Sequence, residues 1–361
     1  MKTAGGHEVE LGLIEGFYGR PWTWAERTDT IAFLAGHGYG FYLYAPKADP
    51  FLRRRWREPH PAETLEGLKA LSAHCAVNGV RFGVGLSPFE IYRAFDAAAK
   101  EDLAHKLVEL AAAGVVDLAI LFDDMRGDLP GLAQTQIEIL HWIAERTTAS
   151  RLILCPTYYS DDPVLDRVFG ARPDGYLEAL GAGLDPTIDI FWTGEEVCSR
   201  AYSVSHVGRV GEAMRRKPLI WDNYPVNDGP VMSQSLHLRA FTGRPAAMAG
   251  AIRGHAVNPA SQAVLSRIPA LSLAESYRDG EAYDYGAAFG RAAAQVLGPE
   301  LARVVHGHLS MLQDSGLDRL DEAVQARLRA RYKSFDHPAA REVLAWLDEV
   351  WTITRADTEA S

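Results

Sequence analysis

The sequence has few cysteines, no long apolar run and no excess of basic residues. Its three cysteines, Cys75, Cys155 and Cys198, form no CxxC pair, so neither a disulfide framework nor a thiolate metal site is expected. No apolar segment approaches the ~18 residues that a membrane span needs, and residues 1–10 are polar, unlike a secretory leader. We therefore expect a cytoplasmic protein in a reducing compartment, without a membrane partner.

The charge balance and the glycine spacing argue against two further classes of protein. The 361-residue chain has 37 Lys and Arg against 47 Asp and Glu, a formal net charge of −10. Nucleic-acid binding needs clustered cations, so nucleic acid is not an expected partner. Neither Rossmann nor P-loop glycine spacing occurs, because Gly36, Gly38 and Gly40 precede an apolar run instead of following one. We expect no cofactor.

Short apolar runs rich in β-branched and aromatic residues alternate with stretches of helical periodicity. The eight runs are Val9–Ile14, Gly40–Tyr44, Arg81–Leu86, Val115–Phe122, Leu152–Cys155, Ile188–Trp192, Pro218–Trp221 and Ala247–Ile252. Such an alternation over roughly 255 residues predicts an α/β fold of the (β/α)8 TIM-barrel type, whose usual size is about 250 residues. A doubly wound open sheet is the structural alternative.

The C-terminal part of the chain differs from the rest. After about Tyr277 the strand pattern stops, and apolar residues recur at helical spacing, as in the set Leu301, Val305 and Leu309. We expect a catalytic barrel over 1–276 and a C-terminal α-helical bundle over 277–361. This bundle would cover the surface of the barrel or a second chain in an oligomer.

Polar residues follow one predicted strand after another. They lie in Glu15–Arg20, Ala45–Lys47, Asp123–Asp124, Pro156–Tyr159, Trp192–Gly194, Trp221–Asn223 and His255–Pro259. In a TIM barrel the carboxyl ends of the strands converge on one face, where the chemistry takes place. These residues are therefore expected to meet around one opening.

The most informative pair is Asp123 and Asp124, directly after the apolar run that ends at Phe122. Adjacent carboxylates at a buried strand end repel each other and lose hydration, so we expect a raised pKa in at least one, as suits a general acid. Neighbours on a regular strand point to opposite faces, so both reach the opening only if the strand has ended or bulged there. The plainer alternative is a loop start with a helix-capping Asp.

Aromatic residues at or beyond the strand ends indicate a sugar site. They are Trp22, Trp24, Trp192, Trp221, Tyr158 and Tyr159. Sugars have apolar C–H faces that suit flat walls and a rim of hydroxyls that needs convergent donors and acceptors. Lys47, Asn223, Asp228 and Asn258 supply both kinds.

Together these segments resemble glycoside hydrolase family 84, the family of protein O-GlcNAcases and bacterial β-N-acetylglucosaminidases. The matching segments are Ile14–Trp22, Tyr42–Lys47, Trp56–Pro59, Leu86–Pro88, Leu121–Asp124, Cys155–Thr157, Trp192–Gly194, Trp221–Asp228 and Asn258–Pro259. They occur in the family's order over about residues 9–260.

The resemblance implies hydrolysis of terminal β-linked N-acetylglucosamine (GlcNAc) with retention, without a metal. The nucleophile is then the 2-acetamido oxygen of the substrate, an exception to the scheme with two carboxylates. Asp123 matches the residue that orients the acetamido group, and Asp124 matches the general acid and base. Tyr159 and Asn223 match contacts to the acetamido group and the reacting centre. The residues that match sugar contacts are Gly16, Lys47, Asp228 and Asn258, with Trp221 as a pocket wall. The expected partner is a glycoconjugate that bears GlcNAc, such as an O-GlcNAc protein.

Two other functions fit parts of the pattern. Asp123, Asp124 and Asp128 are oxygen ligands of the kind that a divalent cation takes in a barrel lyase or aldolase. A catalytically silent glycan-binding module is the second alternative, although a lectin has no need for two adjacent buried acids. The basic run Arg53–Arg57 is interpreted as a solvated loop.

Overall fold

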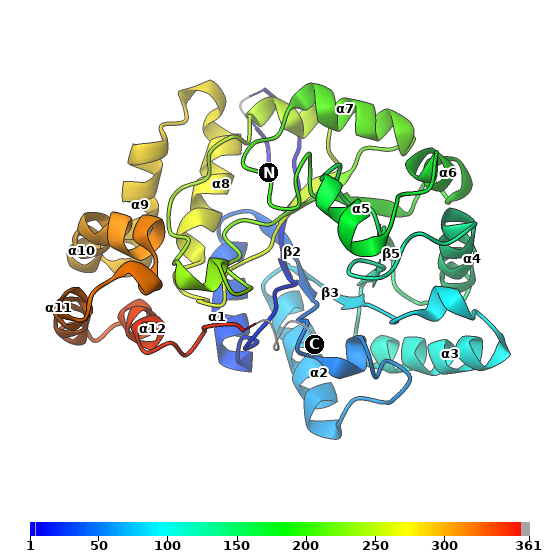
Figure 1. Ribbon diagram of the computed structural model, residues 1–361, viewed down its shortest axis with the longest axis horizontal. Coiled ribbons are helices and arrows are strands. Elements are labelled where there is room, and N and C mark those ends of the chain that lie inside the picture. The colour runs from blue at the N-terminus through cyan, green and yellow to red at the C-terminus, as the bar shows by residue number, and fades with distance from the viewer. Residues whose placement is uncertain (4, 355–361) are drawn as a thin grey trace.

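The computed structural model describes residues 1–3 and 5–354, and in this part of the chain eight parallel strands form a closed barrel (Figure 1). The strands are β1 Leu11–Glu15, β2 Tyr39–Tyr44, β3 Arg81–Leu86, β4 Asp117–Leu121, β5 Arg151–Cys155, β6 Asp189–Trp192, β7 Leu219–Asp222 and β8 Gly254–Val257. They are paired in chain order, and β8 closes the barrel against β1. The predicted TIM barrel is confirmed.

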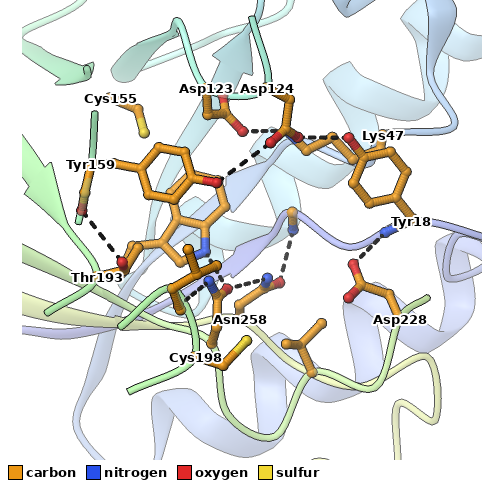
Figure 2. Close-up of a pocket in the computed structure, with 15 residues that line it drawn as sticks. Tyr18, Lys47, Asp123, Asp124, Cys155, Tyr159, Thr193, Cys198, Asp228 and Asn258 are labelled. Atoms are coloured by element: carbon orange, nitrogen blue, oxygen red, sulfur yellow. Dashed lines mark hydrogen bonds and ion pairs between the residues drawn. The ribbon is translucent and has the colours of Figure 1, made fainter. Parts of the chain in front are cut away.

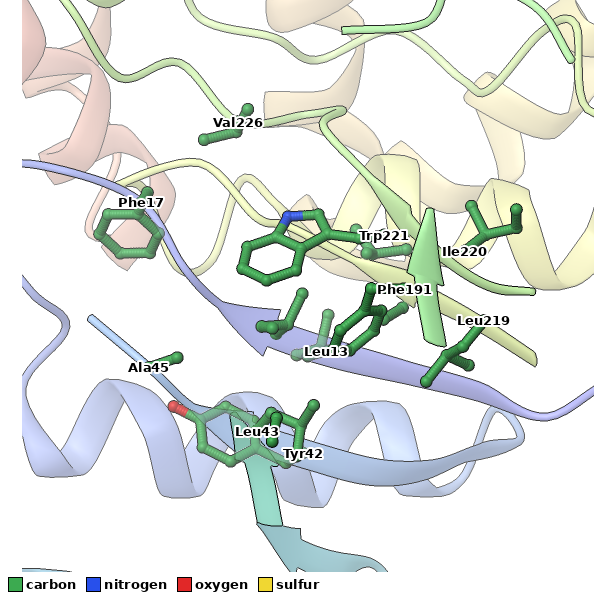
Figure 3. Close-up of a cluster of buried hydrophobic side chains, with 14 of the residues drawn as sticks. Leu13, Phe17, Tyr42, Leu43, Ala45, Phe191, Leu219, Ile220, Trp221 and Val226 are labelled. Carbon is green, nitrogen blue, oxygen red and sulfur yellow. The ribbon is translucent and has the colours of Figure 1, made fainter. Parts of the chain in front are cut away.

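Helices cover the outside of the barrel (Figure 1). They are α1 Trp24–Ala35, α2 Ala62–Val77, α3 Ala97–Ala112, α4 Leu132–Ala144, α5 Pro163–Phe169, α6 Tyr176–Gly183, α7 Val204–Ala213 and α8 Arg267–Asp279. The start of α1 is fixed by a capping box in which Thr23 and Glu26 bind each other's backbone N–H. The interior of the barrel is packed with apolar side chains, including Leu13, Leu43 and Phe191 (Figure 3).

The eighth strand lies elsewhere than the sequence predicts. The apolar run 247–252 falls mainly in a 3-10 helix, Ala246–Gly250, and β8 follows at Gly254–Val257. Three of the six residues in the run are alanine and only Ile252 is β-branched, whereas strands favour β-branched residues. The true strand contains His255, which is fully buried because its ring nitrogens lie 2.9 Å from Asp222 Oδ2 and 2.9 Å from the Tyr277 hydroxyl. A histidine satisfied in this way tolerates the core.

The predicted C-terminal helices are present. They are α9 Tyr285–Leu297, α10 Pro299–Leu309, a π-helical turn Ser310–Ser315, α11 Glu322–Lys333 and α12 Pro338–Leu347. Helix α8 crosses the predicted domain boundary at 276 and packs against α9. The division into two domains therefore stays a prediction, and residues 355–361 lie outside the described residues.

Helix α12 is attached to the barrel through buried polar contacts. The backbone N–H groups of Val264 and Leu265, which precede α8, donate to the Glu342 carboxylate at 2.8 and 2.9 Å. The indole N–H of Trp346 donates to Ser233 O at 3.3 Å. The C-terminal helices thus hold the segment that follows β8, which carries part of the candidate site.

We expect Glu342→Ala to destabilise this attachment. Two buried N–H groups would lose their acceptor, which costs about 1–3 kcal/mol each, so the free energy of unfolding should fall by roughly 2–6 kcal/mol. Denaturant unfolding measures the change. The control is Glu322→Ala, at an exposed position on α11, and an equal loss in both variants would contradict the role given to Glu342.

Candidate active site

All nine residues predicted for the site line one cavity of about 580 Å³, part of it open to solvent (Figure 2). They are Gly16, Lys47, Asp123, Asp124, Tyr159, Trp221, Asn223, Asp228 and Asn258. The chain positions of these residues follow the carboxyl ends of six strands, β1, β2, β4, β5, β7 and β8, except that Trp221 belongs to β7 itself. The barrel topology therefore brings them together from across more than 240 positions, from residue 16 to residue 258.

The paired acids both face the cavity because the strand has ended. Strand β4 stops at Leu121, and Asp124 adopts a left-handed backbone conformation with φ 56°. This conformation is uncommon for a non-glycine residue and costs on the order of 1–3 kcal/mol. It turns the chain so that consecutive carboxylates point to the same side (Figure 2).

Lys47 joins the two carboxylates. Its buried ammonium group contacts Asp123 Oδ2 and lies 3.3 Å from Asp124 Oδ2. The second oxygen of Asp123, Oδ1, is buried and has no hydrogen-bond partner among the described residues. Asp123 therefore offers one free acceptor, while the positive charge of Lys47 offsets the repulsion within the pair.

Asp124 is more open than Asp123 and has two tyrosine neighbours. Its side chain is 25% exposed, and its oxygens accept from the Tyr18 hydroxyl at 2.6 Å and from the Tyr159 hydroxyl at 3.5 Å. Burial favours a higher pKa for Asp124, but the charges of Lys47 and Arg53 and the hydrogen bond from Tyr18 outweigh it. The pKa of Asp124 is thus lowered, whereas the sequence predicts a raised pKa in at least one member of the pair.

Asp228 is a carboxyl group of the cavity whose pKa is raised. Burial raises its pKa to about 6, and the negative charge of Asp124 adds to the effect. The backbone N–H of Tyr18 donates to Asp228 Oδ2 at 2.9 Å (Figure 2). Tyr18 therefore contacts two carboxylates of the cavity, Asp124 through its hydroxyl and Asp228 through its backbone N–H.

The opposite side of the cavity is formed by amides and an indole. Asn223 Oδ1 accepts from the Trp221 indole N–H at 3.0 Å and from Asn258 Nδ2 at 2.9 Å. Asn258 Oδ1 in turn accepts from the backbone N–H of Gly16 at 3.2 Å. This chain of hydrogen bonds fixes the orientation of both amides and holds the indole as a flat wall.

Most of the aromatic residues proposed as walls belong to the core instead. Trp22 and Trp192 are buried, and Tyr158 is buried with its hydroxyl donating to Gly170 O at 2.6 Å. Trp24 stacks on Tyr44 with ring centroids 5.9 Å apart. Among the six aromatic residues named from the sequence, Trp221 and Tyr159 line the cavity. Position after a strand does not distinguish a side chain that fills the barrel from one that lines its opening.

The three acids of the metal hypothesis do not come together. Asp128 forms a fork with Arg126, with N···O distances of 2.5 and 2.9 Å, and does not line the cavity. Within residues 1–3 and 5–354, no cluster of three or more His, Cys, Asp or Glu side chains has an arrangement able to hold a metal ion.

Comparisons with known proteins identify the family. A family model described as β-N-acetylglucosaminidase matches residues 11–308, most of the chain. The chain belongs to this family. The resemblance to glycoside hydrolase family 84 is confirmed.

The relatives and solved structures of the family agree with this assignment. Protein O-GlcNAcase of Mus musculus and that of Rattus norvegicus are each 28% identical over 286 residues, covering 76% of this chain and 30% of theirs. The chain thus spans about a third of the length of these curated relatives. A variant of the O-GlcNAc hydrolase of Thermobaculum terrenum has a TM-score of 0.76 and 30% identity, covering 94% of this chain and 74% of that one.

The structure adds residues that the sequence analysis of this family member does not assign. Tyr18, Cys155, Thr193, Val197, Cys198 and Val226 also line the cavity. Tyr18, Cys155 and Thr193 lie in or just after strands, in segments that the resemblance already includes. Their place at the strand ends is the signal that points to them. Val226 follows β7 in the matching segment Trp221–Asp228, whereas Val197 and Cys198 lie in a loop outside the matching segments, where the sequence gives no comparable signal.

Gly16 is expected to be indispensable for the indole wall. A Cβ atom at this position would lie 2.4 Å from Trp221 Cζ2, in overlap with the ring. We expect Gly16→Ala to displace the indole and to lower the free energy of unfolding by about 1–3 kcal/mol, as overpacking does. A crystal structure and denaturant unfolding measure the two effects.

The control for Gly16→Ala is Gly208→Ala on helix α7, where an added Cβ meets nothing within 4 Å. Alanine is the better helix former, so this variant should be neutral or slightly stabilised. An unmoved indole in Gly16→Ala would contradict the packing argument.

Proposed function

We propose that this chain is a retaining glycoside hydrolase that removes terminal β-linked GlcNAc, with the substrate's acetamido group as the nucleophile. The observation that carries the proposal is the free oxygen of Asp123. This buried acceptor lies in a cavity next to a second carboxylate, and the first oxygen of Asp123 is held by Lys47. An acceptor in this position suits the N–H of an acetamido group, and family membership supports the same chemistry.

In this proposal, Asp123 orients the acetamido group so that its carbonyl oxygen attacks the anomeric carbon. Holding the nucleophile next to the reacting carbon removes an entropic barrier that can amount to about 7–11 kcal/mol. The attack closes an oxazoline ring, and water then opens it with overall retention. Oxygen from the substrate replaces the enzyme nucleophile of the usual retaining scheme.

Asp124 is proposed as the general acid and base. It would donate a proton to the leaving oxygen in the first step and take one from water in the second. Its side chain is the more exposed of the pair, with 25% exposure against 7% for Asp123. This exposure supports the assignment, since the leaving group and the incoming water must reach the acid.

The remaining residues are proposed to bind the sugar. Lys47, Asp228 and Asn258 offer charged and amide groups to the hydroxyls, Gly16 lines the cavity beside them, and Trp221 forms the flat wall. Tyr159 and Asn223 are proposed to contact the acetamido group and the reacting centre. Tyr159 lies beside Asp124, with its hydroxyl 3.5 Å from Asp124 Oδ1, and Asn223 lies on the opposite side, where it accepts from the Trp221 indole.

The proposed substrate is GlcNAc attached to a protein side chain. The support is the name of the curated relatives, protein O-GlcNAcase, and of the bacterial O-GlcNAc hydrolase. We also propose a reducing location such as the cytoplasm, because the cysteines are unpaired. No helix among the described residues is long and apolar enough to cross a membrane. Association of chains through the C-terminal helices stays a prediction.

The test compares aryl N-acetyl-β-glucosaminide with the matching aryl β-glucoside. We expect turnover of the first only, because the second lacks the internal nucleophile. Asp124→Ala should reduce the turnover of poor leaving groups far more than that of activated phenols, since general acid catalysis contributes about 10²–10⁴-fold. Asp123→Ala should impair both kinds of substrate. Steady-state kinetics with a series of leaving groups measures these differences.

Two controls address the alternative functions. A chelator should leave the activity unchanged, whereas a barrel lyase or aldolase would lose it. Binding of GlcNAc without any hydrolysis, measured by calorimetry, would favour the glycan-binding module. Equal turnover of glucoside and N-acetylglucosaminide would contradict the proposed nucleophile.

Substrate binding is expected to weaken at acidic pH because of Asp228. Its pKa is about 6, so the carboxylate that accepts from a sugar hydroxyl is lost as the pH falls through 6. We expect KM to rise below this pH, while kcat changes less. Asp228→Asn is neutral at every pH, so it should raise KM and abolish this dependence. The control is Asp336→Asn, at a fully exposed position. A wild-type KM that is constant between pH 5 and pH 7, about one unit either side of this pKa, would contradict the assignment.

A further inference from the structure

The basic run Arg53–Arg57 is not uniformly a solvated loop. Arg54, Arg55 and Arg57 are exposed, as the sequence interpretation expects, but Arg53 is 5% exposed. It lies just after the 3-10 helix Pro50–Leu52, between β2 and α2. A buried arginine in a surface loop needs a physical reason, because burial of a charge without a partner is costly.

The surroundings of Arg53 provide no direct ion pair. Among the described residues, no carboxylate lies within 4 Å of its guanidinium group, and its Nε–H is buried without a hydrogen-bond partner. Nη1 donates to the Tyr18 hydroxyl at 3.1 Å. The guanidinium carbon lies 5.8 Å from the ring centroid of Tyr18 and 5.9 Å from that of Phe89. Within residues 1–3 and 5–354, the side-chain hydrogen bond of this cation therefore goes to a neutral hydroxyl at the edge of the candidate active site.

The loop that carries Arg53 is held firmly in place. The Asp49 side chain accepts from the Tyr44 hydroxyl at 2.9 Å and from the backbone N–H of Phe51 at 3.0 Å. The backbone N–H of Ser87, which follows β3, donates to Leu52 O at 2.7 Å. These contacts tie the loop to the ends of β2 and β3, so the position of Arg53 is set by the barrel.

The contact with Arg53 decides which way the Tyr18 hydroxyl points. A guanidinium group donates hydrogen bonds and cannot accept one. When Arg53 donates to the Tyr18 oxygen, the hydroxyl hydrogen is left for the other neighbour, Asp124 Oδ2, at 2.6 Å. The direction of the hydrogen bonds therefore runs from Arg53 through Tyr18 to Asp124.

We propose that Arg53 is a positioning residue for the general acid: it orients the Tyr18 hydroxyl toward Asp124 and thereby holds the carboxyl group in place. This inference rests on the proposed function, in which Asp124 transfers the proton. Arg53 itself does not line the cavity, so it acts through Tyr18. It is a contributor to the chemistry that neither the strand-end rule nor the paired acids indicate.

The same arrangement has an electrostatic consequence. The charged and titratable groups that face Asp124 are Lys47, Arg53, Tyr18, Tyr159, Cys155, Asp123 and Asp228. The two cations hold the pKa of Asp124 below its ordinary value against the effect of burial. Loss of the Arg53 charge should therefore raise the pKa of Asp124, and the basic limb of the pH profile should move to higher pH.

The experiment compares Arg53→Met with Arg53→Lys, Tyr18→Phe and the double variant Arg53→Met/Tyr18→Phe in the full chain. The matched control is Arg55→Met, because Arg55 lies in the same loop, is 53% exposed and pairs with Glu58. The readouts are kcat/KM against pH and its dependence on the leaving group, on aryl and alkyl N-acetyl-β-glucosaminides. Thermal unfolding of each variant shows whether it is folded.

We expect Arg53→Met to lower kcat/KM about 10–100-fold for the alkyl substrate and only a few-fold for an activated aryl substrate, since the loss falls on proton transfer. Its basic limb should move up by about one pH unit. Arg53→Lys keeps the charge and should restore the wild-type limb. At a pH below the basic limb, where a change in the pKa of Asp124 has no effect, the double variant should be no worse than Tyr18→Phe, because both changes break the same contact.

Three results would overturn the inference while leaving the proposed function intact. They are a wild-type pH limb and leaving-group dependence in folded Arg53→Met, additive losses in the double variant, or an equal effect of Arg55→Met. If Arg53→Met does not fold, Arg53→Lys and Tyr18→Phe test the inference through the same two readouts, the basic limb of kcat/KM against pH and the leaving-group dependence. Absence of turnover by the wild-type protein would overturn the proposed function and this inference together.

Discussion

The cavity depends on one buried cation between two adjacent carboxylates. Two like charges about 4 Å apart repel by about 4 kcal/mol at an effective dielectric constant near 20, so adjacent carboxylates need a compensating positive charge. Lys47 contacts both, and it comes from the loop after β2, which β3 separates from β4 in the barrel. The end of β4 and the left-handed backbone at Asp124 then serve one purpose, which is to place two consecutive acids on the same side of that ammonium group.

Apart from Asp228, the rest of the cavity has no charged side chain among the described residues and is ordered by dipoles. The amides of Asn223 and Asn258 and the indole N–H of Trp221 satisfy one another, so this wall keeps its shape before any ligand arrives. One side of the cavity is thus ionic and the other is neutral and flat. Such a division suits a sugar that has an apolar face and an amide substituent, because each part meets a surface of its own polarity.

The sequence predicts those features that depend on chain position alone. The residues after the strands converge because parallel strands end on one face, and this rule places Asp123, Asn223 and Asn258 in one cavity. It does not place β8, because His255 is a polar residue within a strand and its burial depends on Asp222 and Tyr277. The burial of Arg53 likewise depends on where a loop packs in three dimensions.

The charges around Asp124 are a compromise between two demands of the proposed reaction. A lowered pKa makes the carboxylic acid a stronger proton donor to a poor leaving group, but it also reduces the protonated fraction at neutral pH. The second step needs the carboxylate as a base, and Lys47, Arg53 and the Tyr18 hydroxyl all stabilise that form. One carboxyl group must act in both steps. Donors that favour the carboxylate suit the second step, in which it acts as a base. The side chain stays 25% exposed, so the leaving group of the first step can still reach it, as can the incoming water.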